Sequence, residues 1–109
     1  MRKPISLRQV SVLPIVTYFK PVGVPRKYLQ EVRLSVDEYE AIRLKYYKGL
    51  NQILGAEAMK VSQTTFYRIL ASARKKLADA LSNGKAIRIV GGHFNLSYTH
   101  QKDINKETK

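Results

Sequence analysis

Four residues near the start of one expected helix have side chains suited to the edges of DNA bases. They are Gln63, Thr64, Tyr67 and Arg68, and spacings of three and four place them on one side of a helix. Gln63 can form two hydrogen bonds with adenine, and Arg68 can form two with guanine. These residue types and spacings predict contacts with bases in the major groove of double-stranded DNA.

Cationic and hydroxyl side chains flank this set. Arg74, Lys75 and Lys76 follow it on the same helix and are suited to phosphate oxygens. Ser62 begins the helix, where its hydroxyl and the free amides of the first turn can bind a phosphate, and Lys60 lies just before it. We predict phosphate contacts from all five. A further candidate is a basic arm at the N-terminus, formed by Arg2, Lys3 and Arg8.

Two helices joined by a tight turn are needed to present these side chains. Residues 52–70, QILGAEAMKVSQTTFYRIL, have the features of such a pair. Gly55 and Ala56 are small enough for two helix backbones to approach closely. Apolar contacts between the helices are expected from Met59, Val61, Phe66 and Ile69. The combination predicts a helix-turn-helix whose second, recognition helix enters the major groove.

Three helices are expected, over residues 35–48, 51–59 and 62–83. Each begins at a residue that can cap it: Ser35, Asn51 and Ser62. Apolar residues at helical spacing predict the buried positions. These are Val36, Tyr39, Ile42, Tyr46 and Leu50 in the first helix, Ile53, Ala56 and Met59 in the second, and Phe66, Ile69, Leu70, Ala73, Leu77 and Leu81 in the third.

Short extended segments flank the helices. Residues 9–13 alternate polar and apolar side chains, and residues 86–90 do so around Arg88, which predicts two strands. Residues 29–34 fit either a helical turn or an extended stretch. We expect a single mainly α domain over residues 1–94, in which the N- and C-terminal flanking strands form a small β element. Residues 95–109 are polar, lack apolar periodicity and are predicted to form a disordered tail.

Composition narrows the classes of function. The 109 residues include 20 Lys and Arg against 8 Asp and Glu, a formal charge of +12, which favours a polyanionic partner. The absence of cysteine excludes disulfides and thiolate zinc sites. No signal peptide is recognised, and no apolar run approaches the ~18 residues of a membrane helix, so we expect a cytoplasmic protein without membrane association. Charge alone does not separate DNA from RNA.

Four stretches resemble a known family. They are LPIVTYFKPVGVP (13–25), LSVDEYEAIRLKYYKGLNQ (34–52), KVSQTTFYRILASARKKLADAL (60–81) and NGKAIRIVGG (83–92). In these the chain resembles the uncharacterised prokaryotic family of predicted DNA-binding proteins known as domain of unknown function 134. The turn and second helix are also similar to region four of bacterial sigma factors. The resemblance implies a helix-turn-helix fold and a role in DNA binding and transcription.

The chain departs from the family pattern at three places. Lys60 stands where glycine is usual, so a residue with a side chain is expected to adopt a positive φ. Ile53 and Leu54 replace a more polar pair, which enlarges the buried or partner-facing surface. Leu7 and Ser11 stand where many members have cysteines, so no metal or redox role of those cysteines applies to this chain.

Other classes of function were weighed against DNA binding. We expect no enzyme, because the acids at 37, 38 and 40 are explained by helix capping and the helix dipole. His93 and His100 lack a third ligand, so we expect no metal or other cofactor. RNA binding, non-specific nucleic-acid binding and a protein-interaction module stay as alternatives, the first through the aromatic pair Tyr18 and Phe19. We predict sequence-specific binding to double-stranded DNA by a transcriptional regulator, with a homodimer and any small-molecule effector left open.

Overall fold

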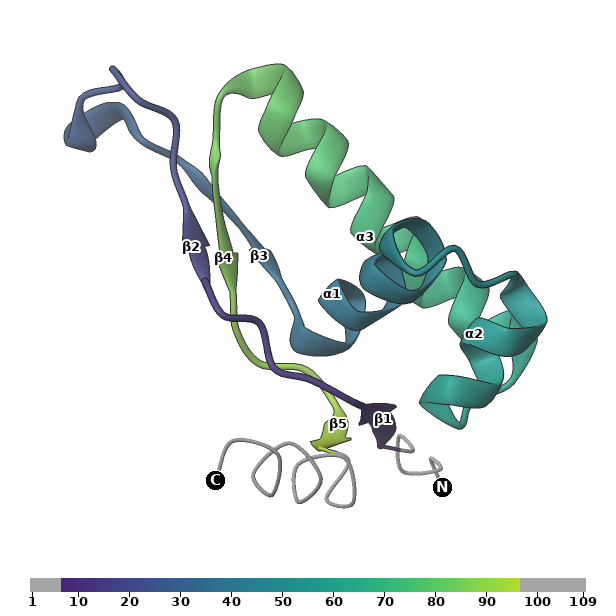
Figure 1. Cartoon of the computed structure of the whole chain (residues 1–109). Helices are drawn as coiled ribbons and strands as arrows, with labels where there is room; N and C mark the ends of the chain where they lie inside the picture. The colour runs from purple at the N-terminus through teal and green to yellow at the C-terminus, as the bar shows by residue number, and fades with distance from the viewer. Residues whose placement is uncertain (1–6, 97–109) are drawn as a thin grey trace, which may run out of the picture.

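The computed structural model describes residues 7–96, and Figure 1 shows three α-helices beside a narrow sheet. The long helix α3 (Gln63–Asn83) lies along one face of the sheet. Helices α1 (Val36–Ile42) and α2 (Gln52–Met59) both pack against it. This mainly α architecture with a small β element agrees with the expectation from the sequence.

Five short strands form two sheets. Strand β4 (Ala86–Ile89) is central in the larger one, with β2 (Tyr18–Phe19) antiparallel on one side and β3 (Glu31–Leu34) parallel on the other. The smaller sheet pairs β1 (Arg8–Val10) in parallel with β5 (Phe94–Leu96). Segments from both ends of the chain therefore meet within one molecule.

The strands differ from expectation in three respects. The N-terminal strand covers Arg8–Val10 rather than residues 9–13, and it pairs with β5 rather than with residues 86–90. Residues 95 and 96, expected in the tail, belong to β5, because Phe94 and Leu96 pack against the buried cluster beneath the sheet. Residues 97–109 lie outside the described part of the chain. The ambiguous segment 29–34 contributes β3.

The first helix changes character along its length. Ser35 caps α1 through a capping box: its hydroxyl accepts from the Glu38 amide, and the Glu38 carboxylate accepts from the Ser35 amide. A π-helical segment follows over Arg43–Tyr47, with the Lys48 amide donating to the Arg43 carbonyl at 2.8 Å. The wider turn shifts the helix face. Tyr46, expected to be buried, is therefore 54% exposed, and Leu44 is buried instead.

The other two helices keep close to their expected bounds, and both end in a left-handed residue, at Lys60 and Gly84. Two apolar residues expected inside are exposed: Ile53 and Leu81. The inward face of α2 is centred on its two small residues and Met59, which leaves Ile53 at the side. The last turns of α3 extend beyond α1 and α2 and have only the sheet beside them (Figure 1), and Leu81, in these turns, is 82% exposed.

The buried residues form two clusters joined by α3. One lies among the helices around Met59 and Phe66, which are both fully buried. The other lies under the sheet around Val10 and Ile89. Because α3 contributes Phe66, Ile69 and Leu70 to the first and Ala73 to the second, its position is set along most of its length.

Candidate nucleic-acid interface

The turn from α2 to α3 holds its central residue in a left-handed conformation. Lys60 has φ 55° and ψ 47°, as its place in the turn predicted, and this conformation is unfavourable for a residue with a Cβ. Its amide donates to the Glu57 carbonyl at 3.1 Å, and the Val61 amide donates to the Ala56 carbonyl at 3.0 Å. Ser62 then caps α3 by accepting from the Thr65 amide at 3.0 Å. These bonds fix the direction in which α3 leaves the turn.

The two helices touch at a glycine. A Cβ added at Gly55 would overlap the ring of Phe66, which is itself fully buried. Gln52 adds a second link, because its side-chain amide donates to the Gln63 carbonyl at 3.3 Å. Gly55 therefore permits the close approach expected from the sequence, and the first turn of α3 is held by both packing and a hydrogen bond.

The four residues predicted to contact bases all lie on the solvent-facing side of α3. Gln63, Thr64 and Arg68 are exposed, and Tyr67 is 52% exposed. Between them, Phe66, Ile69 and Leu70 point inward and are buried. The structure thus brings the predicted set together on one accessible face, with the core directly behind it.

The residues predicted to contact phosphate fall into two groups. Lys60, Arg74 and Lys75 are exposed. Lys76 instead turns toward α1, where its ammonium group lies 2.7 Å from a Glu38 carboxylate oxygen and 2.8 Å from the Arg33 carbonyl. The hydroxyl of Ser62 is engaged with Thr65, at 3.0 Å from its side-chain oxygen. Lys76 and the Ser62 side chain therefore already have partners within the protein, although Ser62 is exposed and the Lys76 side chain is 37% exposed.

Tyr46 joins the candidate interface although the sequence placed it in the core. Its hydroxyl accepts a hydrogen bond from the Arg74 guanidinium at 2.9 Å, and Arg74 lies 6.0 Å from the centre of the Tyr67 ring. The hydrogen bond with Tyr46 raises the pKa of Arg74 above its already high value, so the group stays charged. No local sequence pattern predicts the π-helical segment that turns Tyr46 outward.

Two carboxylates in this part of the fold, those of Glu40 and Asp79, are bound by cations other than Arg68 and Lys75. Glu40 is 1% exposed and binds the Arg43 guanidinium through two hydrogen bonds of 2.8 and 3.0 Å. Asp79, on α3 itself, lies 3.0 Å from the Lys85 ammonium. Arg68 and Lys75 have no carboxylate partner within residues 7–96, so the outer face of α3 carries positive charge that no acid of this part of the chain neutralises.

Glu38 is the most heavily bonded of these acids. Burial alone would raise its pKa, but hydrogen bonds from Lys76, Ser72 and the Ser35 amide outweigh that effect and lower it. The sequence predicted that Glu38 caps a helix. In the structure it caps α1 and also accepts hydrogen bonds from two side chains of α3. It ties α1 to the middle of α3 through Ser72 and Lys76.

Of the three residues predicted to form a basic N-terminal arm, only Arg8 lies within the described part of the chain. Arg8 lies in β1 with its side chain 16% exposed and its guanidinium 3.8 Å from an Asp37 carboxylate oxygen. It is thus part of the packed structure rather than of an extended arm. Arg2 and Lys3 lie outside the described residues.

Residues 7–96 contain neither a membrane-spanning helix nor a cluster of metal ligands. None of their helices combines the length and the apolar character that crossing a bilayer requires. No three or more His, Asp or Glu side chains among them are grouped so that they could hold a metal ion.

Comparison with known proteins places this arrangement in a family. The model of the family described as "Protein of unknown function DUF134" matches residues 1–97, which include every element of the fold. The chain belongs to this family.

Curated DUF134 relatives carry the name UPF0251. One from Caldanaerobacter subterraneus is 57% identical over 94 residues, covering 86% of this chain and 80% of the relative. One from Thermoanaerobacter sp. (strain X514) is 54% identical over 102 residues, covering 94% and 90%. One from Halothermothrix orenii is 47% identical, covering 94% and 76%. No solved structure matches the chain. The names state membership without an activity, so function has to be argued from the surface.

Proposed function

We propose that this DUF134 protein is a helix-turn-helix transcriptional regulator that binds specific sites in double-stranded DNA through α3. The observation that carries the proposal is the exposed side of α3. Residues able to hydrogen-bond base edges occupy its first two turns, and exposed cations with no carboxylate partner in residues 7–96 follow them. Helices of this kind enter the major groove with their N-terminal residues toward the bases.

The packing behind α3 supports the proposal. A recognition helix must be held rigidly if its side chains are to distinguish one base pair from another. Here the turn at Lys60, the contact of Gly55 with Phe66, and two buried clusters fix α3 against the other elements. Arg68 and Gln63 therefore extend from a supported backbone.

Electrostatics supports a duplex as the partner. Along α3, Arg68, Arg74 and Lys75 project from one side, and the carboxylate nearest in sequence, Asp79, is occupied by Lys85. Such a stripe matches the charge of a phosphate backbone on either side of a groove. Displacing condensed counterions from DNA would then add to the affinity and make it depend on salt.

RNA recognition by stacked bases receives less support. The aromatic pair that suggested it begins at Tyr18, whose ring has the Arg88 guanidinium 4.3 Å from its centre. That face of the ring is therefore covered by a cation which is itself bound to Glu31 at 2.9 Å. Stacking of an unpaired base there would have to displace the pair.

The proposal is tested by selecting sites from random duplex DNA with the full chain and titrating the selected site at several salt concentrations. We expect one recurring sequence, bound roughly a thousandfold or more tighter than random duplex at physiological salt. Two-fold symmetry in that sequence would show that a dimer binds. Weak binding to all duplexes with a steep salt dependence, and no recurring sequence, would refute sequence-specific recognition.

Two substitutions separate base contacts from phosphate contacts. Arg68→Ala should cost about 1–3 kcal/mol on the selected site and reduce the preference at one base pair. Lys75→Ala should weaken binding to every duplex alike and lower the salt slope by about one. Lys27→Ala removes an equal charge from the remote turn Arg26–Tyr28 and serves as the control. Equal losses for Arg68→Ala on selected and random DNA would disprove the assigned role.

A further inference from the structure

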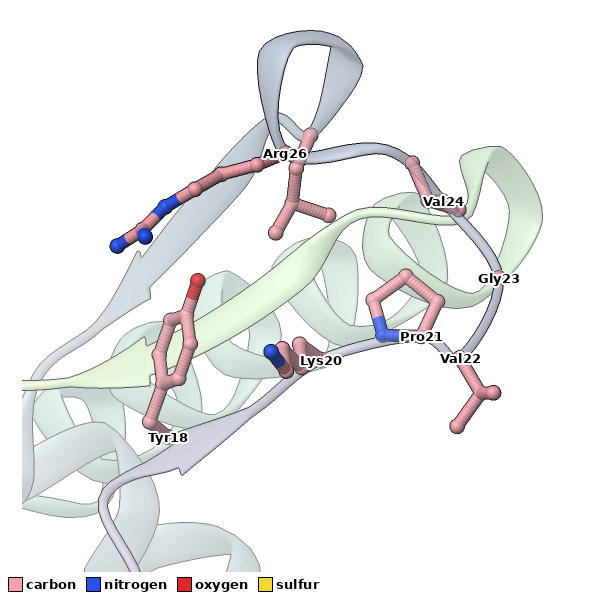
Figure 2. Close-up of a pocket in the computed structure, with 8 residues that line it drawn as sticks. Tyr18, Lys20, Pro21, Val22, Gly23, Val24 and Arg26 are labelled. Atoms are coloured by element: carbon pink, nitrogen blue, oxygen red, sulfur yellow. The ribbon is translucent and has the colours of Figure 1, made fainter.

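A second feature lies at the far end of the molecule from the first turn of α3. The chain leaves β2, turns at Pro21–Val24, passes through a single 3-10 turn at Arg26–Tyr28 and returns as β3. The loop and the end of β2 enclose a cavity of about 390 Å³ (Figure 2). That volume falls within the range of small-molecule sites, ~300–1,000 Å³.

The cavity lies on the side of the sheet that faces away from α3. Phe19 pairs with Ile87 in the strand register, and both line a second hollow with Ala80 and Leu81 of α3. Lys20 and Pro21, at the end of β2, border both hollows. Tyr18, the neighbour of Phe19, must point to the opposite side, because successive side chains in a strand alternate. Of these two neighbours, Tyr18 lines the 390 Å³ cavity and Phe19 does not. The cavity therefore lies on the side of the sheet to which Tyr18 points.

Two cations line the cavity without an internal partner. Lys20 and Arg26 are both exposed, and neither forms an ion pair within residues 7–96. In Figure 2 the Arg26 side chain runs back from the loop toward the hydroxyl end of Tyr18, and Lys20 lies beside the same ring. Glu31, on the adjoining strand, is bound to Arg88, and no acid lines the cavity.

The rest of the lining is largely apolar. Pro21, Val24 and Leu29 contribute hydrocarbon surface, and the cavity is larger than a lone inorganic anion requires. A planar guanidinium and an ammonium group together are a strong combination for phosphate oxygens. A phosphate joined to a compact apolar or flat group would satisfy both parts of the lining.

We propose that this loop cavity binds a small phosphorylated metabolite, with Lys20 and Arg26 holding its phosphate. The site is separate from the DNA-contacting surface, because α3, with 21 residues, is ~30 Å long and the cavity lies near its C-terminal end. A contact between this loop and the phosphate backbone of DNA is the competing source of the same chemistry. The inference does not rest on the proposed regulator function.

The test is a titration of the isotopically labelled full chain with phenyl phosphate at constant ionic strength, followed by amide chemical shifts. Phenol, which lacks the phosphate, is titrated in parallel. We expect saturable shifts confined to residues 18–29 with phenyl phosphate and none there with phenol. Arg26→Gln and Lys20→Gln should each raise the dissociation constant about tenfold or more, since each removes a charge-assisted hydrogen bond.

Lys27→Gln is the matched control, because it removes one positive charge from the same turn at a residue that does not line the cavity. It should change the dissociation constant by less than about twofold, as expected of an exposed, solvent-screened charge that does not contact the ligand. Equal losses in all three variants would refute the site, since they would reflect general attraction to a basic surface. Absence of saturable shifts, together with weaker duplex binding by Arg26→Gln, would overturn the proposal and assign the loop to DNA instead.

Discussion

Neighbouring cations on α3 have different surroundings. On the outer side, Arg68 and Lys75 are exposed and have no carboxylate partner in residues 7–96. On the side facing α1, Lys76 lies 2.7 Å from Glu38. Arg43, directly after α1, is also paired with a buried carboxylate, that of Glu40.

Charged side chains therefore have two roles in this chain: some hold elements together, and others stay exposed to solvent. A buried carboxylate is tolerated only when a cation and hydrogen bonds replace its lost hydration, so the inner pairs hold elements together. An exposed cation without a partner contributes little to folding and stays available to an external anion. Substitutions on the inner side should therefore change stability, whereas those on the outer side should change DNA affinity alone.

The largest effect is expected at Glu40. Glu40→Gln leaves Arg43 without its carboxylate and weakens the bond from the Ser11 amide, which lies 3.1 Å from the Glu40 oxygen. Breaking a buried pair of this kind costs about 3–5 kcal/mol, measured as the free energy of unfolding in urea. Glu57→Gln, on the exposed side of α2, is the control and should stay within about 0.5 kcal/mol of wild type. Equal effects of the two would remove the distinction between inner and outer charge.

A smaller loss of stability is expected at the contact between α2 and α3. Gly55→Ala forces a methyl group against the Phe66 ring and should cost about 1–3 kcal/mol in the free energy of unfolding. Combining it with Phe66→Leu, which shortens the opposing side chain, should cost less than the sum of the two single changes. Strict additivity would show that Gly55 does not act through Phe66. Outer variants such as Arg68→Ala should leave the same unfolding curve unchanged.

The smallest effect is the pH dependence due to Glu38. Its folded pKa is lowered from the ordinary 4.5, so the ionised group stabilises the fold fully above that value. The contribution is lost as the pH falls through the lower folded pKa. Urea unfolding of wild type and Glu38→Gln should therefore differ most above about pH 5, and the difference should shrink toward pH 3. Asp79 and Glu31 also have lowered pKa values but are present in both proteins. A constant difference across this range would contradict the assignment.

Much of the helical structure could be predicted from local signals. Ser35, Asn51 and Ser62 each cap a helix as expected, since a cap needs only its own side chain and the amides that follow it. The positive φ of Lys60 was implied by the resemblance to the family, whose members usually have glycine at this position. Exposure of the Gln63–Arg68 face followed from the apolar residues behind it.

Other features depended on contacts between distant residues. Nothing near Tyr46 in sequence indicates the π-helical segment or the bond from Arg74, 28 residues away. The inward turn of Lys76 depends on Glu38, and the pairing of β1 with β5 joins opposite ends of the chain. Strands of three residues carry too little periodicity to identify their partners.

The sequence by itself determined where the helices begin and which side of α3 faces outward. These depend on interactions within a few residues, where spacing and side-chain type suffice. The tertiary structure alone decided which cations are free. Lys75 and Lys76 are adjacent and chemically identical, but within residues 7–96 only Lys76 contacts a carboxylate, because α1 lies on its side of α3.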